Sequence, residues 1–199
     1  MHLINLPQKK FNDSYLNRSV KTLSKGINLN KSKDVERACQ FAILLYSANF
    51  EDDAISLVCS FARDIEYSEK SGAWIGKEIG LSLVAYHHFI NGNKNEAKSI
   101  LCEIFDSNPN LDLKNTDWVI ERLEDDIECY TPKSEWPDDI RNMRQNAILG
   151  HTSTIASMIF NFLTCLFFCD APQNFLSKAE KILKQEFQEL DQMHNETCS

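Results

Sequence analysis

Carboxylates crowd one segment of this sequence more densely than any other residue type that can do chemistry. Nine acidic residues and only two basic ones lie between positions 117 and 139. Carboxylates at that density can attract a basic surface, bind a hard metal ion or exchange protons with a substrate. Four of them recur at i, i+3, i+4 and i+7, the spacing of one helix face, and we call them the acidic stripe: Glu121, Glu124, Asp125 and Glu128.

The acidic stripe opposes the local preferences of a helix. It contains two like-charged pairs at i,i+4, each costing roughly 0.3 kcal/mol, and it approaches the helix C-terminus, where acids oppose the dipole. Only Arg122 and Asp126 form an oppositely charged i,i+4 pair that can offset this repulsion. Because local rules tend to fail at functional sites, we predict that the stripe, with Asp138 and Asp139 beyond the next loop, binds a basic surface of another protein. The alternative is a solvated face without a partner, at a total cost under ~2 kcal/mol.

Other reactive residue types do not form a recognisable site. Cys165 and Cys169 are at i,i+4, but their apolar neighbours raise a thiol pKa and indicate buried packing. Adjacent histidines, His87 and His88, point about 100° apart on a helix and so do not share a metal ion. His2 and His194 lie near the termini, where disorder is common.

Sequence motifs for catalysis and for cofactors are also missing. The chain has no CxxC pair, no HExxH, no phosphate-binding glycine loop and no GxSxG, and the acidic segment lacks the spacing of an EF-hand. We therefore expect no catalytic residue, no metal site and no cofactor.

The elements that position these residues are predicted to be helices. Apolar residues make up 43% of the chain and repeat at three-and-four spacing, while six Gly and five Pro are too few for the turns of a sandwich or barrel. We predict an all-α fold, an irregular stack or bundle of seven to nine antiparallel helices built from helix hairpins, in a single domain over 1–199.

Three parts follow one another along this domain. Residues 1–33 carry seven basic residues and one acid, without the basic–aromatic alternation typical of nucleic-acid binding, so we expect a solvated first helix ended by Gly26 and no nucleic acid. Residues 34–110 predict two helix hairpins. Residues 111–199 predict the acidic helix at about 116–130 and two C-terminal helices, at about 138–168, with a break near Gly150, and at about 175–193.

Membrane insertion is not expected. Residues 1–11 lack the apolar region of a secretory signal, and the longest apolar stretch, 155–169, is shorter than the ~20 residues that cross a bilayer. We predict a cytoplasmic protein that does not bind membranes.

Three glycines spaced four apart, Gly72, Gly76 and Gly80, favour a close approach of two helices. We expect Trp74 and Ile75 to pack at this crossing.

In the segment 81–110 the pattern is carried by Leu81, Val84 and Ala85 on the first predicted helix, Gly92 at the turn, the small residue Ala97 and the terminal Pro109. With these residues the segment resembles a tetratricopeptide repeat, a two-helix unit of about 34 residues. The segment 38–66 fits the same template less fully, with Asn49 at its turn and no closing proline, and the departures in 81–110 are His88 and Ile104.

Helix-hairpin proteins commonly bind other proteins along a face or groove. In general character the chain resembles bacterial immunity proteins, which are small, acidic and helical and which neutralise a cognate toxin. We expect that function first. The alternatives are a tetratricopeptide-like secretion chaperone or regulatory adaptor that grips an extended peptide, and an enzyme with a carboxylate site on helices.

Overall fold

The computed structural model describes the backbone of residues 1–195, and Cys198 lies outside the described residues. No strand occurs in this part, only an isolated bridge between His2 and Ile27, so the all-α prediction is confirmed. The helices, with two short 3₁₀ turns (η), are α1 Ser14–Leu23, α2 Ser32–Ser47, α3 Glu51–Cys59, η1 Ala62–Asp64, α4 Trp74–Ile90, α5 Lys94–Asp106, α6 Asp117–Cys129, η2 Lys133–Glu135, α7 Asp138–Arg141, α8 Arg144–Phe168 and α9 Gln173–Asn195.

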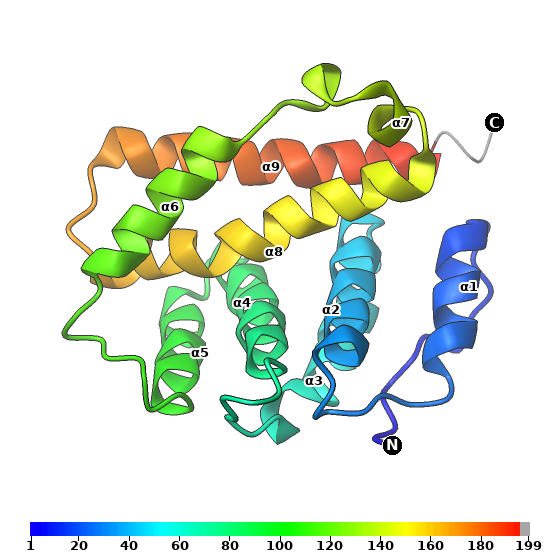
Figure 1. Ribbon diagram of the computed structural model, residues 1–199, viewed down its shortest axis with the longest axis horizontal. Coiled ribbons are helices and arrows are strands. Elements are labelled where there is room, and N and C mark those ends of the chain that lie inside the picture. The colour runs from blue at the N-terminus through cyan, green and yellow to red at the C-terminus, as the bar shows by residue number, and fades with distance from the viewer. Residues whose placement is uncertain (196–199) are drawn as a thin grey trace.

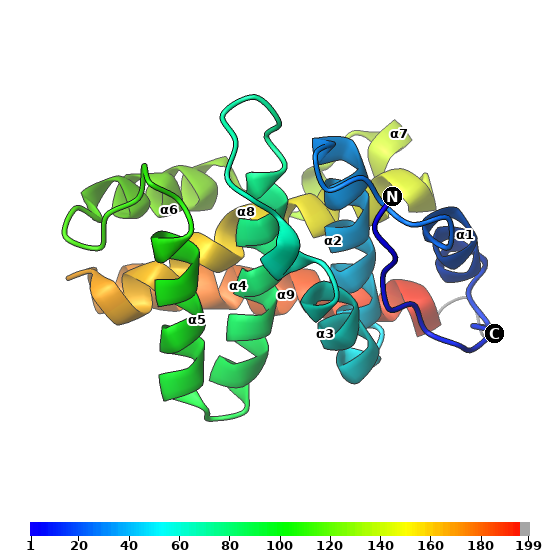
Figure 2. The same ribbon diagram turned by 90° about the horizontal axis from the view of Figure 1, so that it is seen from below.

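The helices lie in two layers (Figure 1). Helices α1 to α5 stand side by side, and the long helices α8 and α9 run antiparallel across them, with α6 laid over α8. Viewed from below, the first layer is seen in front of α8 and α9 (Figure 2). One cluster of buried apolar side chains extends from Phe11 to Met193 and fills the space between the layers.

Helix α8 is the centre of the packing, because it contacts α2, α4, α5, α6, α7 and α9. It is also the one described helix that is long and apolar enough to cross a bilayer. Within this fold 61% of its most apolar window is buried, and core helices pass the same length and composition test.

The two N-terminal hairpins, α2–α3 and α4–α5, turn in the same way. Each turn has one residue in the left-handed region, Asn49 at φ 63° and Gly92 at φ 81°. The following N–H then bonds back to the carbonyl five residues earlier, as in a Schellman motif. These bonds run from Phe50 to Leu45 at 2.9 Å and from Asn93 to His88 at 2.8 Å.

The predicted close approach of helices occurs on α4. A Cβ on Gly76 would overlap the side chain of Val35 on α2, and one on Gly80 would lie 3.0 Å from Val58 Cγ1 on α3. Trp74 is buried as expected, but Ile75 is 58% exposed. The prediction for Ile75 is wrong because one residue along a helix turns the side chain by about 100°, away from the crossing.

The predicted break near Gly150 is also wrong. The chain breaks earlier, at residues 142–143 between α7 and α8, and Gly150 lies inside a continuous helix. Its missing side chain makes room for Trp136, whose Cη2 would lie 2.7 Å from a Cβ at this position.

Candidate functional site

Helix α6 lies on the outside of the molecule (Figure 1). The acidic stripe is on this helix. Its inner residues Val119, Leu123 and Ile127 are buried, and the helix packs on α8 and α9. Because these three positions fix the helix rotation, residues at the stripe positions must face outward. All four carboxylates of the stripe are exposed.

The stripe has no charged partner among the described residues. Among the described residues, none of its four side chains makes a hydrogen bond or an ion pair. The expected relief between Arg122 and Asp126 is not found. The Arg122 guanidinium instead lies 3.8 Å from Glu78 and 5.4 Å from the ring centre of Trp118, while Asp126 accepts hydrogen bonds from Ser157 and Asn161 on α8.

Asp138 and Asp139 do not join the stripe. Both are exposed on α7, which lies near the start of α8, whereas α6 covers the second half of α8 (Figures 1 and 2). Asp138 is paired with Arg141 on the same short helix. The six carboxylates predicted as one surface therefore form a group of four on α6 and a separate pair on α7.

A buried carboxyl that sequence reasoning missed is Glu78 on α4. The residue is 6% exposed and lines a cavity of about 420 Å³ between α2, α4, α6 and α8. Burial raises the pKa of Glu78 to about 7, and the charge of Arg122 only partly opposes that effect. The surrounding sequence, Gly76 to Gly80, gave no sign that Glu78 would be covered.

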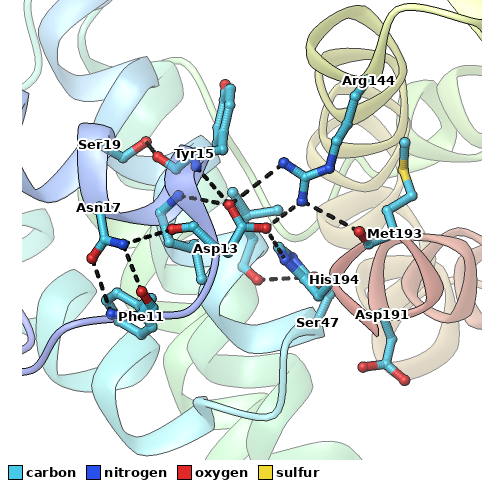
Figure 3. Close-up of polar contacts among 12 residues, drawn as sticks. Phe11, Asp13, Tyr15, Asn17, Ser19, Ser47, Arg144, Asp191, Met193 and His194 are labelled. Atoms are coloured by element: carbon cyan, nitrogen blue, oxygen red, sulfur yellow. Dashed lines mark hydrogen bonds and ion pairs between the residues drawn. The ribbon is translucent and has the colours of Figure 1, made fainter. Parts of the chain in front are cut away.

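A second missed group joins the N-cap of α1 to α8 and to the last turn of α9 (Figure 3). Asp13 caps α1 by accepting hydrogen bonds from the N–H groups of Tyr15 and Leu16. Its carboxylate also accepts from the Arg144 guanidinium and from Nδ1 of His194, which lies 2.9 Å away.

The environment of this carboxylate keeps it ionised. Burial alone would raise the pKa of Asp13, but the bonds from Arg144, His194 and the two N–H groups outweigh burial and lower it to about 2. The expectation of terminal disorder at His194 is wrong, because its ring is buried in this group. His2 is held too, since its Nε2 lies 2.7 Å from the Ser60 carbonyl.

A third group lies between α8 and α9. His151 and Glu186 are both 0% exposed, and Nδ1 of His151 lies 2.9 Å from Oε2 of Glu186. The Trp136 ring covers His151 with centroids 4.7 Å apart. Burial, with the charges of Glu186 and Glu189, raises the pKa of Tyr130 to about 12. Because His151 is closed to solvent, this arrangement joins two helices and offers no access to a substrate.

The cysteines and possible metal ligands add no further site. Burial raises the pKa of Cys165, and its neighbour Cys169 adds to the effect, in line with the apolar setting expected for this pair. Within residues 1–195 no three His, Cys, Asp or Glu side chains are grouped so that they could hold a metal ion.

Comparisons with family models, with curated proteins and with solved structures find no match to this chain.

Proposed function

We propose that this protein is a non-enzymatic binding protein that recognises a basic surface of another protein through the acidic stripe. The observation that carries the proposal is the absence of cations: four exposed carboxylates on one helix face, none paired with another described residue. Such a surface attracts a positively charged partner over several ångströms and raises its association rate.

The packing of α6 supports the same reading. Its inner face is buried against α8 and α9, so the backbone positions of the four stripe residues are fixed on the outer face. A partner therefore meets the four carboxylates already grouped on one helix face. The stripe is costly for the isolated helix and becomes favourable only when a basic surface covers it.

Of the classes of binding protein, we propose an immunity protein that neutralises a basic toxin. The alternative, a chaperone or adaptor with tetratricopeptide-like hairpins, would hold a peptide on a face lined by the first helices of the hairpins. Those helices here are α2 and α4, and α8 contacts both of them. The chain's own helix thus occupies part of the surface that a peptide would need, which favours the stripe.

A site-specific cross-link tests the proposal. A photoreactive amino acid is placed at Glu121, on the stripe, or at Glu69, an exposed acid on the loop before α4. Illumination in cells of the native host should join a basic protein to position 121 and leave position 69 unmodified. A partner cross-linked at position 69 but not at position 121 would place the interface elsewhere and overturn the proposal.

A further inference from the structure

The cavity beneath Arg122 has the composition of a ligand site. It is bounded by α2, α4, α6 and α8, and at about 420 Å³ it is within the usual size of small-molecule pockets. Glu78 contributes a carboxyl group to its lining, while Ile75, Ile79 and Ala156 supply apolar surface. Glu36 and Ser153 are exposed members of the same lining.

The Glu78 carboxylate is poorly satisfied by the protein itself. No described residue donates a hydrogen bond to it, and its only ion pair is with Arg122 at 3.8 Å, beyond hydrogen-bonding distance. Burying a carboxyl without hydrogen bonds is costly. The Glu78 oxygens are therefore available to a hydrogen-bond donor from outside the chain.

The charge around the cavity indicates the sign of that group. Two carboxylates, Glu78 and Glu36, line it against one guanidinium, and Arg122 is itself drawn toward the ring of Trp118. Helix α8 contributes Ser153, Ala156 and Ser157, none of which is charged. Cys39 stays a neutral thiol, because burial raises its pKa to about 12.

We infer that this cavity binds an ammonium or guanidinium group carried on an apolar stem, with the cation against Glu78 and the stem along Ile75 and Ile79. Ile75 is 58% exposed and also lines the cavity, so a bound apolar stem would cover part of this side chain. A free small amine and a lysine or arginine side chain from another protein share this chemistry. This cavity is separate from the acidic stripe, because no stripe residue lines it.

Calorimetric titration of the full chain with n-butylammonium tests the inference. We expect saturable binding to the wild type, loss of about tenfold or more in affinity for Glu78→Gln, and unchanged binding for Glu121→Gln on the stripe. The neutral probe 1-butanol should bind more weakly than n-butylammonium. Failure of n-butylammonium to bind, or equal binding to Glu78→Gln, would make the Glu78–Arg122 contact a structural ion pair only.

A second probe and the pH profile complete the test. N-acetyl-lysine amide shows whether the cation comes from a protein or from a small molecule. If it binds, the cavity can accept a lysine side chain of another protein. If it does not bind although n-butylammonium does, the ligand is a free amine. The affinity of the wild type for n-butylammonium should rise between about pH 6 and pH 8, as Glu78 ionises, since a cation favours the charged form. A flat profile would contradict the inference even if Glu78→Gln failed to fold.

Discussion

Asp13 Oδ2 lies 2.9 Å from Nδ1 of His194, so the residue that caps α1 is bonded to the last turn of α9 across 181 positions of sequence (Figure 3). Arg144, the first residue of α8, completes the group and also donates to the carbonyl of Met193 at 3.3 Å. One carboxylate therefore links three elements: the N-cap of α1, the start of α8 and the last turn of α9.

Replacing Asp13 should lower the unfolding free energy of the protein. Asp13→Asn removes the charge that Arg144 and His194 share and weakens the cap of α1, and we expect a loss of about 2 kcal/mol in unfolding free energy at neutral pH. Asp170→Asn, at an exposed position without a bonded partner, is the control. Chemical denaturation measures both variants, and equal stabilities would show that the group contributes nothing.

Acid should remove the same contribution. The pKa of Asp13 is lowered from 3.8 to about 2, so its stabilisation is present above about pH 4 and disappears as the pH falls through about 2. The difference in unfolding free energy between wild type and Asp13→Asn should stay constant from neutral pH to about pH 4. Below about pH 4 it should shrink toward zero.

Glu78 should act in the opposite direction. Its pKa is raised from 4.5 to about 7, so the folded state holds the proton more tightly than the unfolded chain. This stabilisation is complete below about pH 4.5 and is lost as the pH rises through about 7. Between about pH 5 and pH 8 the unfolding free energy of the wild type should fall by on the order of 3 kcal/mol relative to that of Glu78→Gln. Parallel stability curves for the two proteins would contradict this assignment.

Ala97 tests the packing of the second hairpin. It is 0% exposed on α5, which packs along α4, so Ala97→Leu has no room for three further carbon atoms. We expect a loss of about 1–3 kcal/mol in unfolding free energy. Asn95→Leu, at an exposed site on the same helix, should change stability little. An unchanged unfolding midpoint for Ala97→Leu would contradict the claim that Ala97 lies at a close contact between helices.

Local sequence patterns predicted much of the fold and the outward face of α6. Apolar spacing located the helices, and Asn49 and Gly92 stand where the chain does turn. The pattern at Val119 to Ile127 sufficed to orient the stripe, because helix register is a local property.

The buried polar groups could not be predicted in this way. Glu78 follows Lys77 on α4, and it lines a cavity that α2, α6 and α8 complete only in the folded chain. Asp13 contacts His194 only in the folded chain, and His151 on α8 contacts Glu186 on α9. No spacing along the sequence encodes such pairs, since they depend on how the two layers are docked.

The most direct test of the central claim is the association rate of the cross-linked partner with a charge-reversed stripe. Asp125→Lys with Glu128→Lys turns both repulsive i,i+4 pairs into attractive Glu–Lys pairs and places cations near the C-terminus of α6, so stability should rise by roughly 0.5–1 kcal/mol. Glu66→Lys with Glu69→Lys makes the same change in net charge at exposed positions before α4 and is the matched control.

Stopped-flow measurements at low and high salt give the answer. The reversed stripe should associate at least about tenfold more slowly than the control at low salt, with a smaller difference at high salt, while remaining as stable as wild type or more so. Equal association rates for the two variants at low salt would contradict the claim that the acidic stripe is the interface.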